Sequence, residues 1–195
     1  MERQTGFFAM MARMKYIERW ALMRNSSKEN ISEHSLEVAM LAHGLAVIGC
    51  KRFGKTFSPE HIALLGMYHD CTEIITGDMP TPVKYENEEI REAYKAIESG
   101  AAHRLLRMLP DDMRTEYEQY FLPSYCSKEE AQIVKAADKL SALIKCMEEE
   151  RTGNQEFRSA KESTFASLKK MGLPEVEVFC QEFLPAYQKT LDELS

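Results

Sequence analysis

The sequence has few cysteines and does not arrange them in pairs. There are five, an odd number, and none follows a Cys-x-x-Cys spacing: Cys50, Cys71, Cys126, Cys146 and Cys180. This distribution indicates neither a disulfide framework nor a thiolate zinc site. We therefore expect a protein of a reducing compartment.

Long apolar runs and an excess of positive charge are also missing. No stretch reaches the roughly 20 apolar residues that span a bilayer, and Met1–Met14 lacks the basic start and apolar run of a signal peptide. The net charge of -6 argues against binding a nucleic-acid polymer or an anionic membrane over the whole surface. We expect a cytoplasmic protein in which local arginines or a metal meet any anionic ligand.

What is present is a helical pattern over 195 residues, a length that suits one domain. Apolar residues recur at spacings of three and four, and no sustained alternation indicates a sheet. The expected fold is an all-α helical bundle, with a polar loop at 24–29 and an ordered loop at 76–82. Helices are expected near residues 7–17, 32–49, 58–75, 90–108, 113–122, 127–147, 156–171 and 174–191.

Two details of this helical pattern can be tested directly. Ser32 is a plausible N-cap for the second helix, whose apolar stripe would be Leu36, Met40, His43 and Val47. His43 on this stripe is expected to be a core histidine. The acidic run at 148–150 is expected to be a solvated helix end.

A His-Asp doublet at His69 and Asp70 is the first chemical signal. Imidazole nitrogen and carboxylate oxygen together suit a divalent metal, although such a doublet often arises by chance. His34 stands 35 residues upstream, and Asp138 stands 68 residues downstream within an apolar run. Asp138 is costly to bury unless it is paired or metal-bound, or else it lies on the solvated edge of its helix.

The order His34, His69-Asp70, Asp138 resembles the signature of the HD-domain phosphohydrolase superfamily. Further stretches resemble its bacterial 5′-deoxynucleotidase branch: Arg19-Trp20, Ile31–Ser35, Met67–Glu73 and Gly77–Tyr85. The resemblance covers nearly the whole chain. It implies one HD domain over 1–195, with a metal-binding core at about 30–140 on which the N- and C-terminal helices pack. It also implies a homodimer.

This resemblance gives the candidate residues their roles. The metal ligands would be His34, His69, Asp70 and Asp138. Arg19, whose guanidinium matches phosphate geometry, and Trp20 would orient the substrate phosphate. Glu73 follows Asp70 by one helical turn and would orient or deprotonate water, unless it is a solvent-facing glutamate. The substrate would be bound by Arg19, Trp20, His34, Asp70, Asp78, Met79, Pro80, Thr81 and Asp138.

The expected function is hydrolysis of deoxyribonucleoside 5′-monophosphates to deoxyribonucleoside and phosphate. Asp78 would accept the sugar 3′-hydroxyl, and the loop through Thr81 would leave no room for the 2′-hydroxyl of a ribonucleotide. One divalent metal is expected per chain, from among cobalt, manganese, copper, zinc and iron. The alternatives are an HD phosphohydrolase of a deoxynucleoside triphosphate or a cyclic nucleotide, and a catalytically silent sensor of nucleotide or metal.

Overall fold

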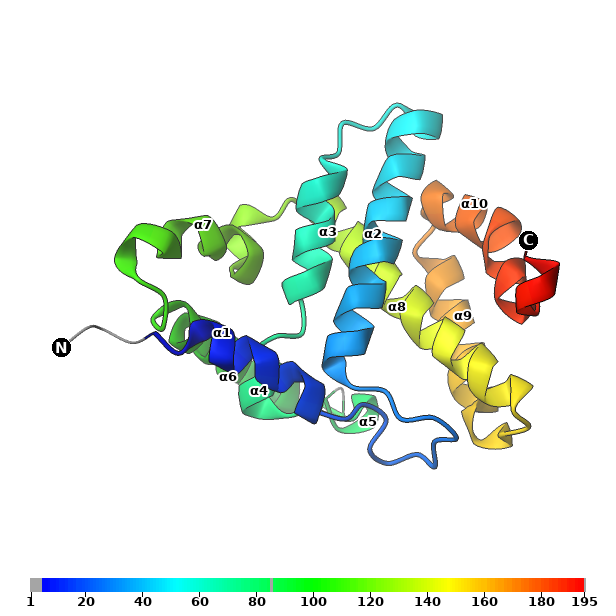
Figure 1. Ribbon diagram of the computed structural model, residues 1–195, viewed down its shortest axis with the longest axis horizontal. Coiled ribbons are helices and arrows are strands. Elements are labelled where there is room, and N and C mark those ends of the chain that lie inside the picture. Colours follow the sequence, from blue (N-terminus) through cyan, green and yellow to red (C-terminus); the bar gives the residue numbers. More distant parts are fainter. Residues whose placement is uncertain (1–4, 85, 195) are drawn as a thin grey trace. The chain divides into compact units, whose positions relative to one another are not determined.

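The protein is built from helices. The computed structural model describes residues 5–84 and 86–194, apart from the side chain of Thr81, and within these residues there is no β-strand. This confirms the all-α prediction. The α-helices are α1 (Phe7–Met11), α2 (Ile31–Phe53), α3 (Pro59–Tyr68), α4 (Glu73–Thr76), α5 (Thr81–Lys84), α6 (Glu88–Leu106), α7 (Asp111–Phe121), α8 (Lys128–Arg151), α9 (Arg158–Lys170) and α10 (Pro174–Glu182) (Figure 1). Short 3-10 helices are η1 (Ala12–Tyr16), η2 (Pro123–Tyr125), η3 (Gln155–Phe157), η4 (Leu184–Gln188) and η5 (Leu191–Glu193).

The helices form two compact units. Unit 1 contains the chain up to Leu22, Lys28–Ser35 and Tyr68–Ser127. Unit 2 contains Met23–Ser27, Leu36–Met67 and the chain from Lys128 onward. The boundaries expected from the sequence, one domain over 1–195 with a core at about 30–140, stay a prediction.

An apolar cluster organises unit 1. Its buried members are Phe7, Met14, Ile31, Cys71, Leu105, Leu106 and Leu109. Phe7 meets the ring of Tyr117 edge-on, with 5.1 Å between the ring centroids, a favourable geometry for aromatic pairs. Because Cys71 belongs to this cluster, the turn that carries His69 and Asp70 is anchored to the core of the unit.

Unit 2 has its own core, in which α8 packs along α9 (Figure 1). Leu45, Leu140 and Ile144 are among its fully buried side chains. The backbones of α2 and α3 approach closely at Gly66, where an added Cβ would lie 3.1 Å from Cα of Ala39. Glycine is therefore needed there for packing.

The second helix differs from its prediction at its start and on its buried face. Asn30 caps it rather than Ser32, since Asn30 Oδ1 accepts from the backbone N–H groups of Ser32 and Glu33 at 3.0 and 3.1 Å. Leu36 and Met40 are 56% and 61% exposed. His43, expected in the core, is also exposed.

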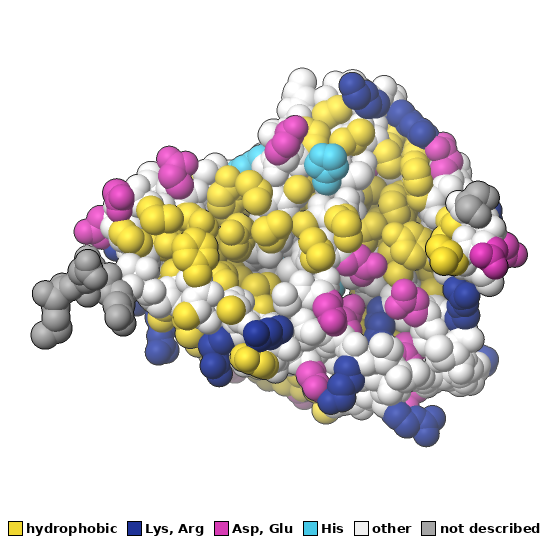
Figure 2. Space-filling model, viewed as in Figure 1, with side chains coloured by type: hydrophobic (Ala, Val, Ile, Leu, Met, Phe, Trp, Pro, Cys, Tyr) yellow, Lys and Arg dark blue, Asp and Glu magenta, His cyan; other side chains and the backbone are white. Residues whose placement is uncertain are grey.

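The buried face of α2 carries a different set of residues, which are Val38, Leu41, Ala42, Leu45, Ala46 and Ile48. Apolar residues occur on both sides of this helix, so periodicity alone favoured the wrong stripe. Figure 2 shows hydrophobic side chains at the surface over α2.

Among the described helices, none combines the length and apolarity that a membrane span requires.

The expected solvation of the acidic run at the end of α8 is wrong for Glu149, which is 1% exposed. Its carboxylate accepts hydrogen bonds from Asn154 Nδ2 and the backbone N–H of Ser26, both at 2.8 Å, and pairs with buried Lys145. Glu148, its neighbour in sequence, is exposed as expected. A polar network inside unit 2 thus holds the Met23–Ser27 segment.

Candidate metal centre

The His-Asp doublet lies in a turn and not in a continuous helix. The expected helix at 58–75 is wrong in this region, because α3 ends at Tyr68 and α4 begins at Glu73. The turn is closed by hydrogen bonds from Cys71 N–H to Tyr68 O at 3.1 Å and from Glu73 N–H to Asp70 O at 2.9 Å. Since Cys71 points into the core, its neighbours His69 and Asp70 point toward the site.

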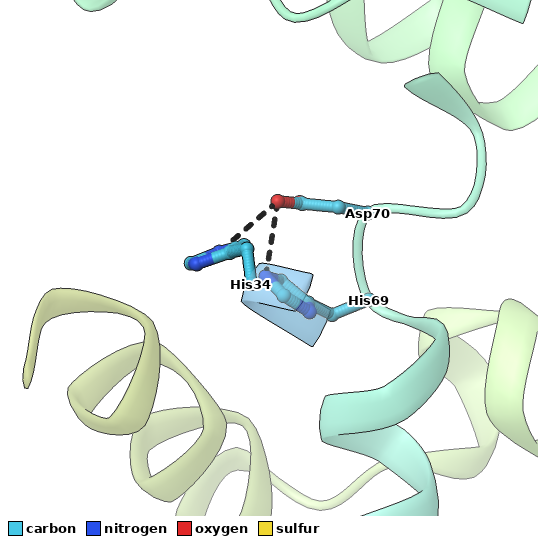
Figure 3. Close-up of side chains that lie close together, drawn as sticks. All are labelled: His34, His69 and Asp70. Carbon is cyan, nitrogen blue, oxygen red and sulfur yellow. Dashed lines mark ion pairs between the residues drawn. The ribbon is translucent and has the colours of Figure 1, made fainter. Parts of the chain in front are cut away.

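Three of the predicted metal ligands come together within unit 1. His34, from the first turns of α2, has a fully buried side chain. The Asp70 Oδ2 atom lies 3.4 Å from His34 Nε2 and 3.1 Å from His69 Nε2. In Figure 3 the Asp70 carboxylate points at both imidazole rings. One potential ligand atom from each residue lies within 4.8 Å of the others.

The donor set fits a divalent cation. Two imidazole nitrogens and a carboxylate oxygen are ligands that divalent transition metals and zinc accept. Burial by itself raises the pKa of Asp70, but the imidazoles of His69 and His34 outweigh it and bring the pKa well below its ordinary value. Asp70 is therefore ionised at neutral pH, as a metal ligand must be.

Glu73 brings a second carboxyl group to the same site. It is 6% exposed, and no described residue donates a hydrogen bond to its Oε2 atom. Burial, together with the negative charges of Asp70 and Asp78, raises its pKa to about 9. The positive charges of Arg19 and Lys84 act in the opposite direction. This crowding of carboxyl groups, one with a buried oxygen unsatisfied by described residues, is what a bound cation would relieve.

Arg19 and Trp20 lie beside these residues. Arg19 Nη1 is 3.4 Å from Asp70 Oδ2, and its guanidinium carbon is 5.9 Å from the centre of the Trp20 ring. Trp20 has a backbone φ of 59°, in the left-handed region that few non-glycine residues adopt. The structure thus places the predicted phosphate-binding pair next to the candidate metal ligands.

The predicted sugar-binding loop follows α4. Gly77, with a φ of 74°, ends that helix, and Asp78, Met79 and Pro80 are half-buried. Burial raises the pKa of Asp78, Arg19 lowers it and Asp70 raises it, and the net shift is upward. Two parts of this prediction lie outside the described structure, the side chain of Thr81 and residue Tyr85. The substrate contacts of the loop stay a prediction.

Asp138 is the predicted ligand that belongs to unit 2. It lies on α8, half-buried, and its role as a fourth ligand stays a prediction.

Glu29 is a residue that sequence reasoning missed, since it fell in a polar stretch interpreted as a loop. No sequence signal singles it out, because its importance comes from two side chains that approach it only in the folded chain: Arg19 Nε and Trp20 Nε1 both donate to it at 2.9 Å.

Comparison with solved structures confirms the HD-domain fold. An HD-domain phosphohydrolase of Listeria innocua superposes with a TM-score of 0.79 at 23% identity, over 93% of this chain and 87% of that one. The HD phosphohydrolase DatZ of cyanophage S-2L superposes with a TM-score of 0.67 at 20% identity, over 93% and 96% of the two chains. DatZ was solved bound to dA and one catalytic Zn²⁺ ion.

Comparison of sequences identifies the family to which the chain belongs. The chain is 50% identical over 193 residues to a 5′-deoxynucleotidase of Vibrio parahaemolyticus, over 99% of this chain and 100% of that protein. It is 49% identical over 192 residues to a 5′-deoxynucleotidase of Klebsiella pneumoniae, over 98% and 96% of the two chains. The family model described as 5′-deoxynucleotidase YfbR-like matches residues 6–187. The chain therefore belongs to the YfbR-like 5′-deoxynucleotidase family.

Proposed function

We propose that this protein is a metal-dependent 5′-deoxynucleotidase, which hydrolyses deoxyribonucleoside 5′-monophosphates to deoxyribonucleoside and phosphate. The observation that carries the proposal is the cluster of His34, His69 and Asp70, with buried Glu73 beside it, in a chain half identical to curated 5′-deoxynucleotidases along their full length.

The cluster would hold one divalent cation, with Asp138 as its fourth ligand. When bound, such an ion polarises a phosphoryl oxygen and lowers the pKa of a coordinated water. Cobalt, manganese, copper, zinc and iron are all compatible with two imidazoles and two carboxylates.

Arg19 and Trp20 would position the phosphate. A guanidinium offers paired N–H donors to phosphate oxygens and keeps its charge at every physiological pH. The Arg19 Nη1 atom already faces the candidate metal ligands, at 3.4 Å from Asp70. A phosphate between Arg19 and the ligands would be held from two sides, which reduces its freedom before the reaction.

Glu73 would orient the attacking water and accept its proton. Oxygen of the water adds to phosphorus while its proton passes to Glu73. The bond from phosphorus to the 5′ oxygen then breaks, and the 5′ oxygen takes up the proton from Glu73 as the deoxyribonucleoside leaves. A pKa of about 9 keeps Glu73 neutral at pH 7 in the metal-free protein. The positive charge of a bound metal ion would favour the carboxylate form of Glu73, which is the form that can accept a proton.

The loop after α4 would select the sugar. Asp78 would accept the 3′-hydroxyl, while Met79, Pro80 and Thr81 would close around the deoxyribose and exclude a 2′-hydroxyl.

We further propose a cytoplasmic homodimer. Exposed apolar side chains on α2, including Leu36 and Met40, offer a surface of the kind that a second copy can cover.

Phosphate release from matched ribo- and deoxyribonucleoside 5′-monophosphates tests the function. We expect release only after metal-stripped protein is reloaded with manganese or cobalt. We also expect a preference for the deoxy substrate of roughly a hundredfold, as a close-fitting pocket achieves against one added hydroxyl. Equal release from both sugars would contradict the sugar selection. Release only from triphosphates or cyclic nucleotides, or nucleotide binding without any release, would favour the alternative functions.

The fourth ligand is tested by the Asp138→Asn variant. We expect its metal affinity to fall by more than the roughly 10- to 100-fold that loss of an outer-shell partner causes, because a ligand itself is removed. Calorimetric titration of the metal-stripped protein with manganese measures this. The exposed Asp112 provides the control, Asp112→Asn. Equal affinities in the two variants would remove Asp138 from the site.

A further inference from the structure

One carboxylate oxygen holds both members of the Arg19-Trp20 pair. Glu29 Oε2 accepts from Arg19 Nε and from Trp20 Nε1, each at 2.9 Å. The side chains of Arg19 and Glu29 are only 11% and 13% exposed, so water competes little for this contact. The orientations of the guanidinium and the indole are therefore coupled through Glu29.

The backbone holds Glu29 opposite its two donors. Arg19 N–H donates to Glu29 O at 2.9 Å, and Ile31 N–H donates to Ile17 O at 3.0 Å. This short antiparallel pairing joins the segment before Trp20 to the segment that enters α2. Trp20 follows directly with a φ of 59°, a strained conformation for a non-glycine residue. Such a conformation persists only when surrounding contacts, here including the Glu29 hydrogen bond, hold it in place.

The contact also determines which edge of the guanidinium faces the site. Glu29 binds the Nε edge of Arg19, while Nη1 lies 3.4 Å from Asp70. A guanidinium rotated about its long side chain would present a different pair of donors. Fixing the Nε edge keeps Nη1 directed toward Asp70.

We propose that Glu29 is a positioning residue for the phosphate, acting through Arg19 and Trp20. This inference rests on the proposed function, since it takes the phosphate to be the group that Arg19 binds. The sign of the expected effect separates positioning from simple electrostatics. Removing a negative charge beside an anion site would by itself strengthen anion binding. Loss of positioning weakens it.

The test is the near-isosteric Glu29→Gln variant, with Glu18→Gln as matched control. Glu18 lies in the same paired segment and carries the same charge, but its side chain is 56% exposed and bonded to Lys28. Calorimetry on the manganese-loaded protein would measure the Kd for inorganic phosphate, and steady-state kinetics would separate KM from kcat. We expect the phosphate Kd and the KM of the deoxyribonucleotide to rise roughly tenfold in Glu29→Gln, with kcat changing less. We expect neither to change in Glu18→Gln.

Trp20 supplies a readout that does not depend on turnover, because it is the only tryptophan in the chain. In Glu29→Gln we expect a shifted emission maximum and greater quenching by acrylamide, with an unchanged far-ultraviolet circular dichroism spectrum. In the Arg19→Lys background, Glu29→Gln is expected to add little to the phosphate Kd, as two residues acting through one contact are not additive.

Unchanged or tighter phosphate binding in Glu29→Gln would overturn the positioning role, and additive effects in the Arg19→Lys background would do the same. If wild-type protein binds inorganic phosphate but hydrolyses no deoxyribonucleotide, the proposed function fails while the Glu29 comparison still gives its answer. If Glu29→Gln fails to fold, Glu29→Asp keeps the charge but withdraws the carboxylate from both donors by one methylene. Wild-type emission and phosphate Kd in that variant would count against the inference.

Discussion

Glu73→Gln is expected to lower phosphate release from deoxyribonucleoside monophosphates by roughly 10²- to 10⁴-fold, the usual contribution of a general base. The amide keeps the size of the side chain and can still orient water, but it accepts no proton. Steady-state rates with saturating manganese measure the loss. The exposed Glu89→Gln on α6 is the matched control and is expected to retain wild-type activity. A loss of less than tenfold would remove Glu73 from the role of base.

Glu73→Gln, which is expected to lower activity, is expected to raise the stability of the metal-free protein. Burial and the neighbouring carboxylates raise the pKa of Glu73 from 4.5 to about 9. Between these values the unfolded chain ionises while the folded one keeps its proton, so this group lowers stability as pH rises. We expect Glu73→Gln to be more stable than wild type at pH 7, by about 3 kcal/mol at most, and equal to it near pH 4. Urea unfolding of metal-stripped protein at both pH values is the measurement. A variant less stable at pH 7 would contradict the assigned electrostatics.

Glu149→Ala is expected to lower the free energy of unfolding by about 3–5 kcal/mol, as loss of one partner of a buried ion pair does. The substitution leaves the buried Lys145 ammonium without its carboxylate. It also removes the acceptor for Asn154 and for the backbone N–H groups of Ser26 and Ser27. Urea unfolding compares it with the exposed neighbour Glu148→Ala, which is expected to cost little. Similar losses in the two variants would contradict the buried network.

This network also predicts an acid limit to stability. Burial by itself raises the pKa of Glu149, but the hydrogen bonds from Lys145, Asn154 and the Ser26 and Ser27 backbone outweigh it and lower the pKa to about 2. Because the folded pKa lies below the unfolded value of 4.5, the stabilisation is complete above about pH 4.5 and is lost as pH falls toward 2. The shift corresponds to about 3 kcal/mol. The stability difference between wild type and Glu149→Gln should therefore shrink over that range, and a difference independent of pH would rule this out.

The all-helical fold could be predicted from the residues alone, because spacings of three and four recur throughout and are specific to helices. Resemblance also identified His34, His69 and Asp70, which the fold brings together. The register of α2 was decided by tertiary structure: apolar residues lie on both of its sides, and only packing selects Val38 and Leu45 over Leu36 and Met40. The end of α3 at Tyr68 could not be predicted from the sequence either. Burial of Cys71 in the core stabilises a turn there, although the local spacing is helical.

Tertiary structure alone decided the electrostatics of individual acids. Glu149 and Glu29 are glutamates in a helical and a polar stretch, and nothing in their local sequence distinguishes them from solvated ones. Resemblance identified Glu73, but not its burial or its raised pKa. Their roles depend on burial and on partners far along the chain, such as Ser26 for Glu149. The order of residue types shows where apolar residues recur along a helix. The charge state and partner of a buried carboxylate depend on distances that only the folded chain defines.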